Sequence, residues 1–221
     1  MTKCYRQFEA MAKAGAGHTT IAEEYLSLID SVIAFHLPIR MTSEDLTLVA
    51  GTGEYTTSDS LIARVWTARY LRSSATGDSY RLEHTDFTKL DLNDGDWRGA
   101  DNAEPQMFYT TGSSAGALRV GLYPFPETSS AGGYPTVRLN VSKRAVLATG
   151  GSLPDMIQND MLYVNGACWR YAEDHRKVEE ANVYRQRFLR DLNEAREFFF
   201  ARNAYDKQDI QHGTFPGSGV V

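Results

Sequence analysis

Cysteine is scarce in this chain. Only Cys4 and Cys168 occur among 221 residues, which excludes the disulfide framework that holds many small secreted domains. We expect reduced thiols, with Cys168 acting as a small buried hydrophobe on the apolar stripe of a helix. A chain of this length forms one or at most two domains, and it buries about 70% of its unfolded surface without a covalent or metal staple.

Long apolar runs are also lacking. No stretch approaches the roughly 18 apolar residues that a membrane span needs. Charged residues interrupt any signal-peptide core near the first residue, namely Lys3, Arg6, Glu9 and Lys13. We therefore expect a protein that is made in the cytosol and has no membrane partner.

An excess of basic residues is missing as well. The chain has 23 Lys and Arg against 28 Asp and Glu, a formal net charge of -5 and a pI near 5.6. Surfaces that grip nucleic acid neutralise phosphates with clustered Lys and Arg, so this balance argues against such a surface. The hydrophobic content of 42% is that of a globular protein rather than a disordered one.

Motifs for catalysis or metal binding are incomplete. Gly15 and Gly17 before a helix outwardly resemble a phosphate loop, but the Walker lysine and a preceding strand are absent. The five histidines are scattered, with no pair at metal-ligand spacing. Gly112-Ser113-Ser114 lies in a loop between predicted strands, and not in a nucleophile elbow.

Acidic residues offer two further candidates. Asp91, Asn93, Asp94 and Asp96 could bind a hard cation, but Gly95 comes one place too early for an EF-hand loop, so a solvated acidic turn is the better interpretation. Acids such as Glu83 and Asp86 could form a glycosidase pair, although a sequence does not show their separation. We expect no enzyme activity, no cofactor and no metal.

Helices are predicted at the start of the chain. A short helix within the first 18 residues is broken by Gly15 and Gly17. A second helix begins near Thr20, which has capping-box spacing to Glu23, and closes at Pro38. Its apolar residues recur at intervals of three and four, as Ile21, Tyr25, Leu28, Ile29, Val32 and Phe35.

Alternating apolar residues from residue 41 onward predict β-strands. Leu46 and Leu48 face the same way, and a hairpin loop is expected at Thr76-Gly77-Asp78. Further strands are expected at 62–71, 80–84, 106–111, 117–122 and 136–142. Short connections without intervening helices predict antiparallel pairing.

Helical periodicity returns after Gly151. Ser152 and Asp155 have capping-box spacing. One apolar stripe covers 157–171 and a second covers 178–199, so the break at 173–177 predicts two antiparallel helices or one strongly bent helix.

The fold class that follows is α+β. We expect an N-terminal helical segment (1–40), an antiparallel, sandwich-like β platform (41–149), a C-terminal helical hairpin (150–203) and a flexible, extended arm (204–221). The helices are expected to form one helical domain.

The second predicted hairpin helix carries candidate contact residues. Arg187 and Arg190 flank Phe188 and Leu189, and arginine beside aromatic residues is a composition enriched in protein interfaces. The alternative is an ordinary solvated face whose charge pairs contribute little to stability.

Three consecutive phenylalanines are the second candidate. Neighbouring helical residues point about 100° apart, so Phe198, Phe199 and Phe200 cannot all enter one core. We expect at least one of them to be covered by another chain or left exposed. Tyr205 and Phe215 in the arm complete the candidate contacts with another chain.

The parts in this order resemble the head-to-tail adaptor, or connector, proteins of tailed bacteriophages. The resemblance spans roughly residues 20–202 and rests on the order and spacing of several segments. These are the helix that ends near Phe35, the turn Ala50-Gly51-Thr52-Gly53-Glu54-Tyr55, the stretch Glu104-Pro105-Gln106-Met107-Phe108-Tyr109, the strand Leu118 to Leu122 running into Pro124-Phe125-Pro126, and Tyr184-Arg185-Gln186-Arg187-Phe188-Leu189.

This resemblance implies a structural role in the virion, at the head-to-tail interface, after assembly in the host cytoplasm. It implies a homo-oligomeric ring of about twelve copies that docks beneath the portal, extends the DNA channel and anchors the tail nozzle or other tail proteins. Double-stranded DNA would pass through the lumen without specific binding, and the arm would order when it docks.

A binding module of a different class remains open. A β-sandwich could recognise a glycan or receptor through exposed aromatic rings, with Trp66, Tyr80, Trp97 or Tyr134 as stacking platforms. Saturable sugar binding by a monomer would favour this module, and ring formation on a partner would favour the adaptor.

Overall fold

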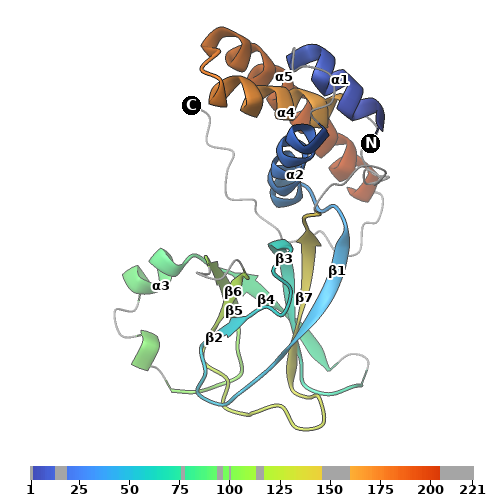
Figure 1. Cartoon of the computed structure of the whole chain (residues 1–221). Helices are drawn as coiled ribbons and strands as arrows, with labels where there is room; N and C mark the ends of the chain where they lie inside the picture. Colours follow the sequence, from blue (N-terminus) through green and yellow to red (C-terminus); the bar gives the residue numbers. More distant parts are fainter. Residues whose placement is uncertain are drawn as a thin grey trace. The chain divides into compact units, whose positions relative to one another are not determined.

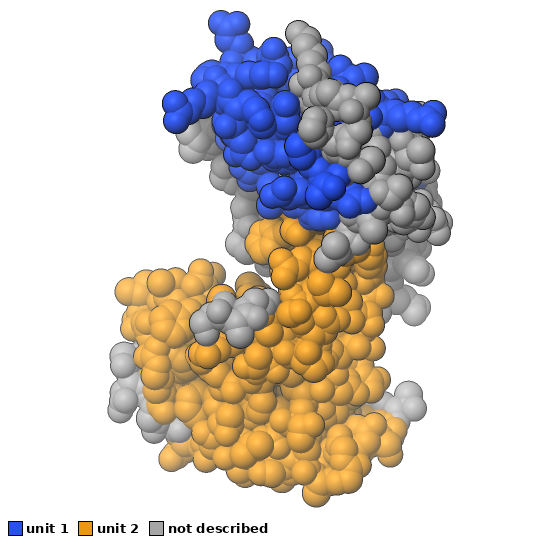
Figure 2. Space-filling view, viewed as in Figure 1, with its two compact units in different colours: residues 1–29, 148–221 blue, residues 30–147 orange. Residues whose placement is uncertain are grey.

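The computed structural model describes residues 2–12, 19–75, 78–93, 97–99, 101–112, 117–145 and 160–204, and its fold is α+β as expected (Figure 1). The chain divides into two compact units (Figure 2). We call residues 1–29 and 148–221 the helical unit, and residues 30–147 the sheet unit. The boundaries 1–40, 41–149, 150–203 and 204–221 remain a prediction.

The helical unit contains the expected helices. They are α1 (Thr2–Ala12), the first part of α2 (Thr19–His36), α4 (Met161–Asp174) and α5 (Val178–Ala204). The predicted helix start at Ser152 lies outside the described residues. The predicted break at 173–177 is confirmed, since α4 and α5 are separate helices and Arg176 between them has a φ of 56°.

Gly166 allows α4 to approach its neighbours closely. A Cβ atom there would lie 2.8 Å from Cγ2 of Ile29 and 2.9 Å from Cδ2 of Phe188. A small residue at this position therefore lets apolar side chains of α2 and α5 press against the α4 backbone. This dense packing stabilises the unit through many weak dispersion contacts.

The sheet unit is built on one mixed sheet of seven strands, in the order β1-β7-β3-β4-β5-β6-β2. Their bounds are β1 (Met41–Thr47), β2 (Glu54–Thr56), β3 (Ile62–Leu71), β4 (Ser79–His84), β5 (Met107–Thr111), β6 (Arg119–Tyr123) and β7 (Thr136–Lys143). The sheet curls, as Figure 1 shows. Leu46 and Leu48 are both buried, as the alternation predicted.

The prediction of purely antiparallel pairing is wrong at one position. β4 pairs with β5 in parallel, through Glu83 with Met107 and His84 with Phe108. Parallel neighbours need a crossover connection, and here the connection includes α3 (Phe87–Asn93) and a short 3-10 helix, η1 (Trp97–Gly99).

Asp91 and Asn93 of the expected acidic turn lie in α3, and Asp94 and Asp96 lie outside the described residues. Asp86 caps the N-terminus of α3, because its carboxylate accepts a hydrogen bond of 2.9 Å from the backbone N–H of Thr88. Leu90 then enters a small core with Trp97 and Tyr109. Burial of these apolar side chains outweighs the polar character that favoured a solvated turn.

Aromatic rings fill this small core beside β5 and β6. The Trp97 ring lies 5.7 Å from that of Tyr109 and 5.9 Å from that of Phe87, edge to face. Gly121 on β6 faces Tyr109, and a Cβ atom at Gly121 would overlap the Tyr109 ring. The strand therefore requires glycine at this position because the ring occupies the side-chain space.

A buried ion pair joins the ends of the sheet unit. Asp30 is fully buried, and its carboxylate accepts hydrogen bonds of 2.8 and 2.9 Å from Arg40. The backbone N–H of Ala145 donates a further bond of 2.7 Å to it. Three hydrogen bonds from two donor nitrogens, Nη1 of Arg40 and the backbone nitrogen of Ala145, thus compensate the carboxylate for its lost hydration.

Candidate interaction surfaces

The inner face of α5 holds the helical unit together. Phe188 is 1% exposed and its ring lies 5.6 Å from that of Trp169 on α4. Phe188 is therefore a core residue of this unit and does not belong to its exposed surface. Asp191 is also buried, and it accepts a hydrogen bond of 2.7 Å from Asn165.

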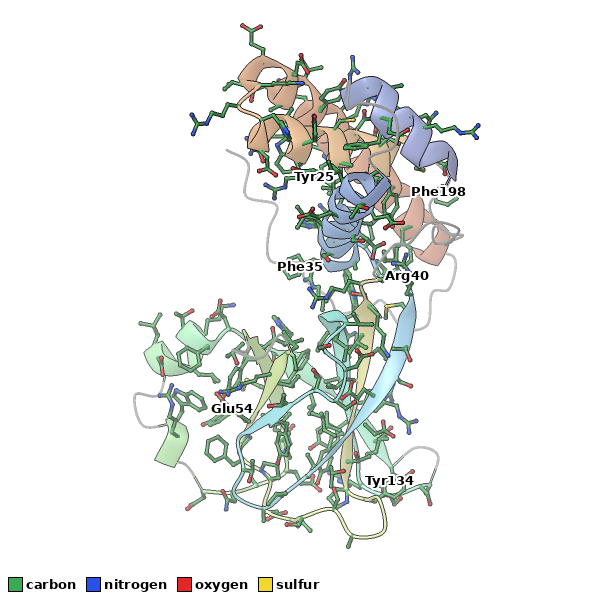
Figure 3. All side chains as sticks on the ribbon, in the orientation of Figure 1. Tyr25, Phe35, Arg40, Glu54, Tyr134 and Phe198 are labelled. Atoms are coloured by element: carbon green, nitrogen blue, oxygen red, sulfur yellow. The ribbon has the colours of Figure 1, made fainter. Side chains whose placement is uncertain are left out.

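The outer face of α5 carries several exposed apolar residues. Val178 is 68% exposed, Val183 46%, Leu189 43% and Phe198 42%. Phe198, labelled in Figure 3, lies on the C-terminal half of the helix, and Phe199 is half-buried. These four residues divide over two sides of α5, with Val178 and Leu189 on one side and Val183 and Phe198 on the other.

The other predicted contact residues differ in how they are placed. Arg187 is exposed, and its guanidinium group lies 5.9 Å from the centre of the Tyr184 ring. Arg190 has a side chain 65% exposed and pairs with Asp191 at 3.0 Å. The side chain of Phe200, and all of Tyr205 and Phe215, lie outside the described residues. A role for these residues in subunit contacts remains a prediction.

A tryptophan between arginines forms a feature that sequence analysis missed. The guanidinium groups of Arg170 and Arg185 lie 4.3 and 5.8 Å from the centre of the Trp169 ring. Nε1 of Trp169 is shielded from solvent and has no hydrogen-bond partner among the described residues. Trp and Arg dominate the energetics of many protein interfaces. The signal in the sequence was Trp169 followed directly by Arg170 on a predicted helix.

The exposed apolar residues of the sheet unit are dispersed. The exposed ones are Phe35, Met41, Val49, Leu61 and Leu92. They lie at the end of α2, on β1, in two loops and on α3, so no single element among the described residues of this unit presents several of them.

The four aromatic residues proposed as glycan platforms are poorly suited to stacking. Trp97 is 1% exposed. The ring of Trp66 is covered by Arg64 at 4.5 Å, and that of Tyr80 has Arg72 at 5.2 Å and donates its hydroxyl to the Pro105 carbonyl at 2.7 Å. Tyr134 is half-buried.

Reactive groups are engaged in structure. Asp91, one of the cation candidates, accepts hydrogen bonds of 2.6 Å from Trp97 Nε1 and 3.1 Å from Arg98. Burial raises the pKa of the Cys168 thiol to about 12, which leaves it protonated and a weak nucleophile at neutral pH. No cluster of three His, Cys, Asp or Glu residues that could hold a metal occurs in the described part of the chain.

Comparison with known families gives a match over most of the chain. The family model described as SU10 adaptor protein matches residues 17–210. The chain belongs to the SU10 adaptor protein family. No curated protein matches it.

Membership of the SU10 adaptor family supports a phage adaptor role, that of a structural component of the virion, as the resemblance implied. The matched range includes the second helix, the whole sheet and both C-terminal helices. None of the described helices of this adaptor is both long and apolar enough to span a membrane.

Proposed function

We propose that this adaptor forms a closed ring of about twelve copies beneath the portal of a tailed phage, extends the DNA channel and anchors tail proteins. The observation that carries this proposal is the outer face of α5, where exposed apolar residues alternate with arginines. Such a surface on a virion component of an adaptor family is best explained by contacts with other chains.

The two units would divide the work. The helices, with Arg187, Arg190 and Phe198 on α5, would build the ring wall and contact neighbouring copies or the portal. The sheet unit would be the platform for the tail nozzle or other tail proteins. Its dispersed exposed residues, among them Leu92 at 84%, offer several separate contact points.

DNA would pass through the lumen without being held. The net charge of -5 supports this, because a lumen that lacks a basic surplus binds phosphates weakly at physiological salt. We further propose that residues 204–221 act as an arm that docks on the portal or on a neighbouring subunit, with Tyr205 and Phe215 as apolar anchors.

Native mass spectrometry with the portal ring of the same phage tests this function. The expected result is a discrete complex of one portal ring with about twelve adaptor copies. A chain that stays monomeric beside the portal would contradict the proposal, and saturable sugar binding by that monomer would favour the glycan module.

A truncation tests the arm separately. Deletion of 206–221 should leave the far-ultraviolet circular dichroism and the melting temperature unchanged while it weakens portal docking. Normal docking of the truncated chain would refute the proposed arm.

A further inference from the structure

The exposed surface of α5 includes two different flanks. Residues spaced by three and four along the helix lie on one side, so the outer residues divide into two rows. The Arg185 flank contains Val178, Asn182, Arg185, Leu189, Asn193 and Arg196, and the Glu194 flank contains Glu180, Val183, Arg187, Arg190, Glu194 and Phe198. Leu189 and Phe198 are nine residues apart, which places them about 180° apart around the helix axis.

The charges of the two flanks differ. The Arg185 flank has two arginines and no acid, and Arg170 of α4 extends it across the Trp169 ring. The nearest acid on α4, Glu173, pairs with Arg170 at 2.9 Å. This flank is therefore basic around an apolar centre.

The Glu194 flank balances its two arginines with carboxylates. Arg190 lies 3.0 Å from Asp191 and 3.7 Å from Glu194, so two carboxylates face one guanidinium group. Glu180, in the first turn of α5, is a further carboxylate on this flank. Glu179 and Glu197 lie between the flanks, on the side of α5 opposite Phe188.

We infer that the Arg185 flank of one copy packs against the Glu194 flank of the next copy, so that successive α5 helices form the continuous wall of the ring. This inference rests on the proposed ring and names its contact. The basic Arg185 flank would face the carboxylates of the Glu194 flank, and each flank adds exposed apolar side chains, among them Leu189 on the first and Phe198 on the second.

Symmetry favours the next copy of a ring over a copy related by a two-fold axis as the partner of the Arg185 flank. A two-fold contact would place one flank against itself, and the Arg185 flank would then bring four arginines together with no acid between them. A head-to-tail contact uses two different surfaces and closes into a ring by rotation. Two dissimilar flanks on opposite sides of one helix supply those two surfaces.

Charge reversal of each flank tests the inference in the full-length chain. R185E/R196E makes the Arg185 flank acidic, and E180R/E194R makes the Glu194 flank basic. Each double variant should lower the fraction of adaptor in portal-bound rings at least about tenfold, because like charges then meet at the contact. The quadruple variant should regain ring formation, because attraction returns with the signs exchanged.

Controls separate folding and overall charge from the contact. R69E/R81E changes the net charge as R185E/R196E does, on exposed residues of the sheet unit, and should assemble normally. Melting temperatures close to that of the unmodified chain should show that all variants fold. The quadruple variant gives a second check, because it must assemble if it folds.

The possible results distinguish this inference from the proposed function. Normal rings from both double variants would overturn the flank contact but would not contradict the proposed ring. Loss in both double variants without recovery in the quadruple variant would also overturn it, and would point to another acidic partner, such as DNA, on the Arg185 flank. An unmodified chain that never assembles on the portal would overturn the proposed function and this contact together.

Discussion

The helical unit and the sheet unit differ in where they leave apolar surface. In the helical unit, four of the exposed large hydrophobic residues lie on α5 alone, beside arginines. In the sheet unit, five such residues lie on separate elements, while large aromatic rings such as Trp97 are enclosed. The helical unit therefore concentrates its exposed apolar residues along one helix, whereas the sheet unit encloses its large rings and leaves only dispersed apolar residues exposed.

The two tryptophans Trp97 and Trp169 test this difference most strongly. Trp97→Ala should destabilise the sheet unit by about 3–5 kcal/mol, since it empties the centre of a packed aromatic core. Trp169→Ala removes a half-buried ring and should destabilise the helical unit less, while it weakens ring assembly. Hydrogen exchange measured unit by unit, together with native mass spectrometry, checks both outcomes. Equal destabilisation by the two substitutions would contradict the difference between an enclosed Trp97 and a half-buried Trp169.

Gly121 tests how tightly the small core is packed. Gly121→Ala should cost about 1–3 kcal/mol, because the new methyl group overlaps the Tyr109 ring and Trp97 blocks its retreat. Gly112→Ala is the matched control, since no atom of the described residues lies within 4 Å of a Cβ there. Urea unfolding of both variants measures the effect, and equal midpoints would show that the core yields easily.

Leu189 and Leu92 compare exposed leucines of the two units. Leu189→Ser should change the free energy of unfolding by less than about 0.5 kcal/mol, because 43% of the side chain is exposed, yet it should reduce ring assembly. Leu92→Ser, at 84% exposed, should leave assembly on the portal unchanged. Sedimentation of each variant with the portal ring provides the measurement. Loss of assembly in the Leu92 variant would move the ring contact to the sheet unit.

Acid should loosen the sheet unit slightly. The hydrogen bond from Arg138 holds the pKa of Asp45 below its ordinary value of 3.8, and Arg72 likewise lowers the pKa of Glu104 below 4.5. The unfolded chain therefore takes up protons first as pH falls through these ordinary values. The stabilisation is present above them and is lost below.

The size of this acid effect should be small, because both pairs are partly exposed. Melting temperatures between pH 6 and about pH 3 provide the measurement. Asp45→Asn should reduce the dependence on pH, and an unchanged dependence would assign the acid sensitivity to other carboxylates.

The order of helices and strands was predictable from local patterns. The strand at Ile62–Leu71 and the helix pair around residues 173–177 follow from apolar periodicity and from a polar break. The parallel pairing of β4 with β5 was not predictable in this way, because it depends on a tertiary contact that Phe87 and Leu90 make in the crossover connection. Both side chains pack in the small core with Trp97, and this contact exists only in the folded chain.

The candidate surface was predictable only in part. Arginines beside apolar residues drew attention to α5, but composition does not reveal that Phe188 faces inward while Leu189 faces outward. That division depends on which side of α5 contacts α4, a tertiary property. The cluster of the Trp169 ring with arginines from two helices is also a tertiary property, so the sequence alone did not predict it.

Electron cryomicroscopy of the adaptor assembled on its portal tests the central claim most directly. We predict a closed ring of about twelve copies stacked on the portal, with the α5 helices of neighbouring copies in contact around the wall. A portal that carries no adaptor density, or a ring joined only through the sheet units, would contradict this claim.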